Sequence, residues 1–151
     1  MKVTGPIELI NGLGPSRWIL NRPLGPDVVT NGAFSADTNW NKGDGWSIGS
    51  GVATNDGSQS ANSLLAQAPV SPVTAGKLYR TEFTITLLTG TGAQSRPIVG
   101  GSGTGTFRGA TGTYVENIVC AGFETVYIQC NDWTAATGDL SVDNYSVREI
   151  Y

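Results

Sequence analysis

The alternation of apolar and polar positions along the chain predicts short β-strands. The clearest segment is 78–88, where apolar side chains such as Phe83 and Ile85 alternate with charged ones such as Arg80 and Glu82. A period of two places the two sets on opposite faces of a strand, and the many threonines and β-branched residues argue against a helix. We expect one face on a core and one that is wet or ligand-facing. The inner positions are Tyr79, Thr81, Phe83, Ile85 and Leu87, and the outer ones are Arg80, Glu82, Thr84 and Thr86.

Turn signals at short spacing predict several further strands. The Asn31-Gly32 pair follows a short apolar strand over 28–30, and Gly49-Ser50-Gly51 is typical of a hairpin turn. The other expected strands cover 46–48, 52–54, 63–70, 113–120, 125–130 and 140–147, with apolar islands at 97–99 and 106–107. Roughly eight short strands of this kind predict an all-β fold, an antiparallel β-sandwich of jelly-roll type.

The N-terminal segment has a different pattern. Residues 1–26 hold four of the seven prolines, and their apolar residues follow no clean period. Proline-rich segments form neither a continuous helix nor a central strand, while a disordered tail rarely carries so many Ile, Leu and Trp. We therefore expect an irregular docking arm over 1–26 and a sandwich domain over 27–151. Trp18, Ile19 and Leu20 are the expected docking residues, because a buried Trp often anchors an interface.

Composition limits the classes of partner. Charged residues make up 14% of the chain and the net charge is −3, so the polar surface consists mostly of neutral hydroxyls and amides. The nine Lys and Arg residues are scattered singly, which argues against nucleic acid, since phosphate binding needs clustered cations. No apolar run approaches the roughly 18 residues needed to cross a bilayer. The first residues lack the apolar segment of a secretory signal, so we expect a protein used without this kind of export, or one whose export segment has been removed.

The reactive side chains do not form a catalytic pattern. The chain has no histidine, which removes the usual general base and an ordinary Ser-His-Asp arrangement. Asp132, Asp139 and Asp143 lie close in sequence, as the carboxylates of a glycosidase would, but turn acids plus one structural acid explain them better. The glycine-rich segment 100–105 lacks the lysine and the helix of a phosphate-binding loop. We expect a protein that is not an enzyme.

The two cysteines, Cys120 and Cys130, form either a disulfide or a pair of buried free thiols. If residues 121–124 make a hairpin turn, Cys130 lies far along the ladder from Cys120, beyond the reach of a disulfide. This geometry favours free thiols.

The tryptophans differ in their expected roles. Trp40 and Trp46 follow the opening turn at Asn31-Gly32 and are expected to pack in or beside the core. Trp133 lies in a polar loop and is a candidate for stacking on a sugar ring, because sugars bind aromatic faces through their C–H groups. A contact with another subunit explains Trp133 equally well.

Tyr127 and Gln129 provide a second set of candidate ligand contacts. They share one face of the strand over 125–130, and Val126, Ile128 and Cys130 share the other. If the sheets are in the appropriate register, Tyr127 and Gln129 line a concave face together with Arg80 and Glu82.

Several short motifs occur in a fixed order over residues 27–149. They are Asn31-Gly32-Ala33-Phe34, Trp40, Gly45-Trp46, Val73-Thr-Ala-Gly-Lys77-Leu-Tyr79, Gly112-Thr-Tyr114 and Asp143-Asn144-Tyr145-Ser146-Val147. Each motif is weak alone, and the ordered series is more specific. The series resembles the jelly-roll domain of many phage virion proteins, which is similar to carbohydrate-binding modules of families 4, 9 and 22.

This resemblance implies a non-enzymatic phage virion protein of the capsid decoration or head-fibre type. Such a protein would be a homo-oligomer on the virion surface, attached by its arm to phage capsid or tail proteins. The alternative is a carbohydrate-binding domain that adheres to cell-surface glycans. A detached module of a secreted glycosidase is a third reading, with less support because no export signal or catalytic partner is present.

The resemblance also raises the question of calcium. In the binding-module relatives a structural Ca²⁺ often lies between the opening turn and the last strand, and Asp143 matches the acid of the closing motif. Ala33 and Ser35 replace both acids of the opening motif, although calcium takes six to eight oxygen ligands, several of them charged. We therefore expect no cofactor, and calcium at Asp143 is the alternative left open.

Overall fold

The computed structural model describes residues 22–69, 73–122, 125–131 and 138–151. These residues form two antiparallel sheets, with strand order β3-β4-β11-β6-β9 in the first and β2-β5-β10-β7-β8 in the second, and β1 pairs with β11. The strands are β1 (Leu24–Asp27), β2 (Trp40–Lys42), β3 (Trp46–Gly49), β4 (Val52–Asn55), β5 (Ser63–Gln67), β6 (Leu78–Leu88), β7 (Ser95–Val99), β8 (Gly103–Thr104), β9 (Gly112–Val119), β10 (Val126–Cys130) and β11 (Leu140–Ile150).

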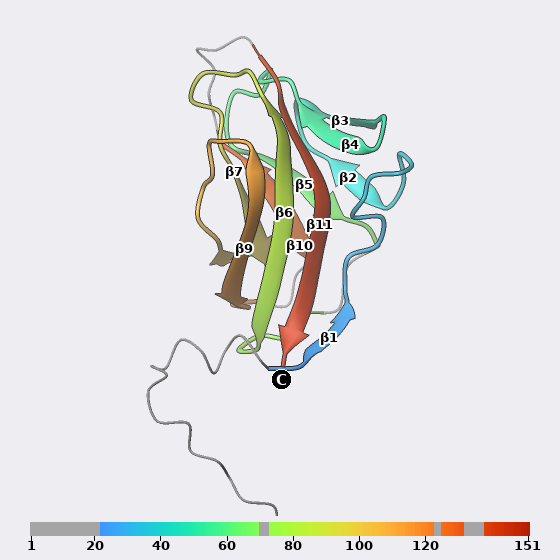
Figure 1. Cartoon of the computed structure of the whole chain (residues 1–151), viewed down its shortest axis with the longest axis vertical. Coiled ribbons are helices and arrows are strands. Elements are labelled where there is room, and N and C mark those ends of the chain that lie inside the picture. The colour runs from blue at the N-terminus through green and yellow to red at the C-terminus, as the bar shows by residue number, and fades with distance from the viewer. Residues whose placement is uncertain (1–21, 70–72, 123–124, 132–137) are drawn as a thin grey trace, which may run out of the picture.

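The two sheets lie face to face, so the predicted β-sandwich is confirmed. In Figure 1 the long strands β9, β6 and β11 lie in front, and β10 and β5 of the second sheet lie behind them. The β3–β4 hairpin and β1 flank opposite ends of β11. No helix of the described residues is long and apolar enough to cross a membrane.

Strand β6 shows how the sequence pattern builds the core. Tyr79, Phe83 and Ile85 are buried between the sheets, as the period of two predicts. Leu87 was expected on the same face but is 42% exposed. The reason is a β-bulge, because β11 pairs Ser141 with Leu87 and the next residue with Ile85, which skips one residue of β6. The extra residue changes the face on which the end of the strand lies.

The hairpin prediction is confirmed, and the first strand differs from its prediction. β3 and β4 pair through Gly49 and Val52, with Ser50 and Gly51 between them. The first strand was expected over 28–30, whereas β1 ends at Asp27. Since Leu24–Asp27 pairs with β11, the last part of the predicted arm already belongs to the first sheet. The division into an arm and a sandwich domain otherwise stays a prediction.

The predicted core aromatics are buried at the opening of the sandwich. Trp40 and Trp46 are 7% and 6% exposed. The Trp40 ring packs against Phe34 and Tyr145, with centroids 5.3 and 6.1 Å away. The aromatic residues of the opening segment therefore close one end of the core.

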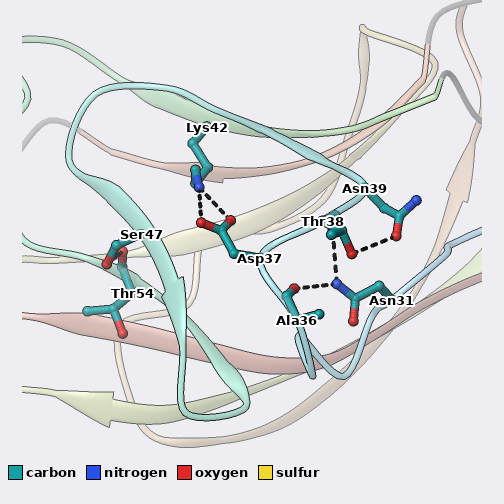
Figure 2. Close-up of polar contacts among 8 residues, drawn as sticks. All are labelled: Asn31, Ala36, Asp37, Thr38, Asn39, Lys42, Ser47 and Thr54. Carbon is teal, nitrogen blue, oxygen red and sulfur yellow. Dashed lines mark hydrogen bonds and ion pairs between the residues drawn. The ribbon is translucent and has the colours of Figure 1, made fainter.

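Asn31 organises the loop that leads into β2 (Figure 2). Its side-chain Nδ2 donates hydrogen bonds to the carbonyls of Ala36 and Thr38 at 2.7 and 2.9 Å. Its Oδ1 accepts from the Ser35 amide at 3.0 Å, and its backbone carbonyl accepts from the Trp40 indole at 3.0 Å. The residue has a φ of 56°, a conformation that Asn tolerates better than most residues.

The glycine after Asn31 is required by close packing against the last strand. A Cβ atom at Gly32 would lie 1.9 Å from the Tyr145 carbonyl oxygen. In return, the Tyr145 amide donates to the Gly32 carbonyl at 2.9 Å. The Asn-Gly pair thus joins the opening turn to β11 rather than turning a two-residue hairpin.

Both cysteines are free and buried, as predicted. Their strands do not form the hairpin assumed in that argument, because β9 pairs with β6 and β10 pairs with β5 and β7. Cys120 directly follows β9 of the first sheet, and Cys130 ends β10 of the second. The conclusion of free thiols holds although its geometric premise does not.

Candidate ligand-binding faces of the sandwich

The predicted ligand residues lie on two opposite outer faces. Arg80 and Glu82 lie on the outer side of β6, because their neighbours in the strand point into the core. Tyr127 and Gln129 lie on the outer side of β10, in the other sheet. The core separates the two pairs, so the expected single concave face containing all four residues is wrong. A period of two shows which residues share a face of one strand, and it does not show how strands are distributed between sheets.

Strand β10 places Tyr127 and Gln129 at the middle of the second sheet, between β5 and β7. Val126, Ile128 and Cys130 are fully buried on its inner side. Tyr127 is half-buried on the outer side, opposite Ala66 of β5 and Ile98 of β7. The predicted division of this strand into two faces is confirmed.

Two residues that the sequence analysis did not select complete this surface. Arg96 of β7 lies opposite Gln129, and its Nε donates to the Gln129 Oε1 at 2.7 Å. The Arg96 guanidinium also lies over the Phe107 ring, 4.3 Å from its centroid. We call the set of Arg96, Phe107, Tyr127 and Gln129 the Tyr127 face. The available sequence signal was the position of Arg96, directly before the 97–99 island and two residues from Ile98, which places both on one face of a strand. The pairing of Arg96 with Gln129 needs the strand register.

The Tyr127 face combines flat rings with oriented polar groups. Tyr127, Phe107 and Arg96 are each half-buried, and Gln129 is 9% exposed. The hydrogen bond and the ring contact of Arg96 fix its guanidinium plane, because a planar fork loses little freedom when it is stacked and bonded. Such a face can pack against the apolar side of a ligand ring and hydrogen-bond to its polar edge.

The opposite face carries a groove over β6 and β11. A cavity of about 580 Å³ lies between this sheet and the chain segment that follows β1. An adjoining cavity of about 400 Å³ shares Leu24 and Arg80 with it. We call the larger cavity the Arg80 groove, and its polar lining comprises Asp27, Arg80, Glu82, Asn144, Ser146 and Arg148.

The described residues do not bring candidate metal ligands together. They contain no group of three or more His, Cys, Asp or Glu side chains placed to share a metal ion. Burial raises the pKa of the Cys130 thiol, which keeps it protonated and unreactive. Burial also raises the pKa of the Tyr145 hydroxyl, with a smaller contribution from the charge of Asp27.

The carboxylate of Asp143 is held by its neighbour Asn144. Both carboxylate oxygens of Asp143 accept hydrogen bonds from Asn144, from its amide at 2.6 Å and its side chain at 3.1 Å. In the opening loop, the Asn31 side-chain amide donates to two of the backbone carbonyls. Because Ala33 and Ser35 replace the opening acids, those two positions add no carboxylate to that of Asp143, although calcium is usually held by several charged oxygens. The expectation of no cofactor, with calcium at Asp143 as the alternative, stays a prediction.

Four predicted site residues lie outside the described residues. They are Trp18, Ile19, Leu20 and Trp133. Their proposed roles in docking and in ligand stacking are neither supported nor contradicted by the fold.

The chain matches solved carbohydrate-binding modules in fold. No family model matches it, and no curated protein matches it. The apo form of BiXyn10A CBM1 superposes with a TM-score of 0.54 at 13% identity, over 77% of this chain and 93% of that one. A mutant of a family 29 carbohydrate-binding module gives a TM-score of 0.47 at 14% identity, over 82% and 89%. The module CBM6cm-2 from Cellvibrio mixtus lichenase 5A, in complex with cellotriose, gives 0.45 at 14%, over 85% and 98%.

At these identities the likeness shows the fold alone. The predicted phage virion role gains no support from it and stays a prediction. The chain has the jelly-roll β-sandwich found in carbohydrate-binding modules.

Proposed function

We propose that this domain is a non-catalytic carbohydrate-binding domain that holds a neutral glycan on the Tyr127 face. The observation that carries the proposal is the fixed arrangement of Arg96, which is hydrogen-bonded to Gln129 and stacked on Phe107 beside the Tyr127 position. Groups that are ordered before binding lose less entropy when a ligand arrives. The jelly-roll fold shared with solved carbohydrate-binding modules agrees with the proposal and does not carry it.

The chemistry of this face matches that of a sugar ring. The Tyr127 and Phe107 rings offer apolar surface to the C–H groups of a pyranose. Arg96 and Gln129 offer planar donors and acceptors to its hydroxyl groups. The four residues include one cation and no carboxylate, and the cation is already paired with a neutral amide and a ring. A neutral, hydroxyl-rich ligand therefore fits the Tyr127 face.

The test is retardation of the protein in native gels that contain soluble xylan, glucomannan or mixed-linkage β-glucan. We expect at least one of these neutral polysaccharides to retard the wild-type protein. Tyr127→Ala and Arg96→Ala should weaken that retardation about tenfold or more, because each removes a contact to the ring or its hydroxyls. Val119→Ala is the matched control, since Val119 is 57% exposed on the opposite sheet. The proposal fails if no polysaccharide retards the wild type, or if Tyr127→Ala binds as the wild type does.

The phage virion function is kept as a second proposal, and an adhesion domain on a particle would use the same face. It rests on the resemblance of the ordered motifs to virion jelly rolls. Homo-oligomerisation, attachment to capsid or tail proteins and a virion-surface location belong to this proposal. Its docking residues Trp18, Ile19 and Leu20 would have to be required for incorporation into particles.

A further inference from the structure

Two arginines face each other across neighbouring strands in the Arg80 groove. Arg80 of β6 is the direct register partner of Arg148 of β11, and both line the cavity of about 580 Å³. Directly opposite residues of an antiparallel pair share a face, with their Cβ atoms about 5 Å apart, and like charges at such positions are destabilising. This arrangement costs stability unless something else favours two cations there.

The nearby carboxylates neutralise these arginines incompletely. Asp27 uses its Oδ1 to accept hydrogen bonds from the amides of Val29 and Val147, each at 3.0 Å. Its Oδ2 is 3.9 Å from the Arg148 Nε, and the Glu82 Oε2 is 3.7 Å from the Arg80 Nη2. Both separations exceed the length of a hydrogen bond. The two guanidinium groups are thus near carboxylates without being bonded to them.

The arginines elsewhere on the sandwich behave differently. Arg96 donates to Gln129 at 2.7 Å, and Arg108 donates to Glu116 at 2.8 and 3.1 Å through two nitrogens. Within the described residues, Arg80 and Arg148 make no side-chain hydrogen bond of ordinary length. An Arg pair with free donors, side by side in a groove, is suited to bind a carboxylate through several charge-assisted hydrogen bonds.

The rest of the groove is suited to hydroxyl groups. Asn144 and Ser146 line it with an amide and a hydroxyl. Strands β6 and β11 each have pairing partners on both sides. Strand β6 lies between β9 and β11, and β11 pairs with β6 on one side and with β4 and β1 on the other. Their backbone groups are therefore used within the sheet, so an added peptide strand would find no edge here. Recognition must come from side chains.

We propose that the Arg80 groove is a second binding site, one that takes an acidic sugar unit of the uronate class. The sugar carboxylate lies between the guanidinium groups of Arg80 and Arg148. The sugar hydroxyls bond to Glu82, Asn144 and Ser146. This site is separate from the Tyr127 face, because the two lie on opposite sheets, and either one can exist without the other.

The experiment is a calorimetric titration of the full chain with a short oligogalacturonate, its fully methyl-esterified form and a short oligo-glutamate peptide. We expect binding of the free acid, weakened about tenfold or more in the ester, because the ester lacks the charge that the arginines bind. Arg80→Gln and Arg148→Gln should each cause a similar loss, and Arg80→Lys a smaller one, since lysine keeps the charge without the planar fork. Raising the salt concentration should weaken binding, because exposed charges are screened.

The matched control is Lys42→Gln, which removes a cation of β2 on the other sheet, outside both proposed sites, and should leave oligogalacturonate binding unchanged. Thermal unfolding of each arginine variant should stay within about 4 °C of the wild type, since the ion pairs concerned are long and exposed. Three results would overturn the proposal: no binding of the free acid, equal binding of the ester, or binding of oligo-glutamate as tight as that of oligogalacturonate. Loss of neutral polysaccharide binding in Tyr127→Ala with retained oligogalacturonate binding would show that the two sites are independent.

Discussion

Asn31 stabilises the opening loop through both its conformation and its side chain. Its amide group donates to the carbonyls of Ala36 and Thr38, and its carbonyl oxygen accepts from Ser35. Its own backbone carbonyl receives the Trp40 indole. One polar residue thus holds the loop closed beside the aromatic end of the core. From the sequence alone, Asn31 is recognisable only as the first residue of an Asn-Gly turn.

Replacing Asn31 should separate these two contributions. Asn31→Ala removes three side-chain hydrogen bonds to the backbone and places alanine at a positive φ, so the free energy of unfolding should fall by about 2 kcal/mol or more. Asn31→Gly removes the same bonds but tolerates this φ, and should be more stable than the alanine variant by about 1 kcal/mol. Urea denaturation of both variants measures the difference. Equal stability of wild type and Asn31→Gly would show that the side-chain bonds contribute nothing.

Among the single elements, the β3–β4 hairpin has a turn conformation that only one of its two loop residues favours. Its two loop residues, Ser50 and Gly51, both have positive φ, at 54° and 77°. Two-residue hairpin loops with this pattern favour Asn-Gly, because asparagine tolerates the left-handed region better than serine does. The hairpin is therefore slightly strained at Ser50.

Ser50→Asn should relieve this strain. We expect the free energy of unfolding to rise by about 0.5 kcal/mol, within the range typical of improved turn residues. Ser50→Val is the opposite substitution, since a β-branched residue is disfavoured at positive φ, and it should lower stability. Thermal unfolding of the two variants in parallel checks the prediction, and a Ser50→Asn variant that melts below the wild type would refute the assignment of this turn.

At the level of the whole molecule, two groups buried in the core make the free energy of unfolding depend on pH in the alkaline range. Burial raises the pKa of Cys130 and of Tyr145 above their ordinary values. In the unfolded chain these groups lose their protons near pH 8.5 and near pH 10, at roughly the values of model peptides. The unfolded state then binds fewer protons than the folded state, and the free energy of unfolding falls as pH rises through this window.

Urea denaturation between about pH 7 and about pH 10.5 tests this dependence. Stability should be fully present below about pH 8.5 and should then fall, with a limiting slope of about 1.4 kcal/mol per pH unit for each group that ionises only in the unfolded chain. Cys130→Ala should flatten the first part of the decline, although it lowers stability at neutral pH by creating a cavity. A free energy of unfolding that stays constant up to about pH 10 would contradict the burial of these groups.

The sequence predicts the two-layer fold and most strands because burial forces side chains to alternate. The alternation correctly predicts that Tyr79, Phe83 and Ile85 are buried. It wrongly predicts burial of Leu87, because a bulge in the pairing with β11 moves that side chain to the other face of the strand. Bulges depend on how two strands match, so the pattern of one strand does not show them. The same reasoning explains why β1 was placed too late, since its pairing with the last strand is a long-range contact.

The candidate site was predictable only within one strand. The sequence pattern correctly places Tyr127 and Gln129 on one face of their strand, but it does not show that Arg80 belongs to the other sheet. The sequence pattern does not reveal Arg96 as a site residue, because its guanidinium is oriented by Gln129 and Phe107. These partners are 33 and 11 positions away in the chain and come close only in the folded protein. Sites assembled across strands need the register, which a single sequence does not contain.

Backbone amide shifts in two-dimensional ¹H–¹⁵N NMR spectra would show whether a glycan binds at the Tyr127 face. The ligand is the neutral oligosaccharide whose polymer retards the protein most. We expect the largest shifts on Arg96, Phe107, Tyr127 and Gln129, and we expect them to disappear in Tyr127→Ala. Amides of β6 and β9 on the opposite sheet should stay unchanged. Shifts confined to the opposite sheet, or a titration that moves no amide of β10, would contradict binding at the Tyr127 face.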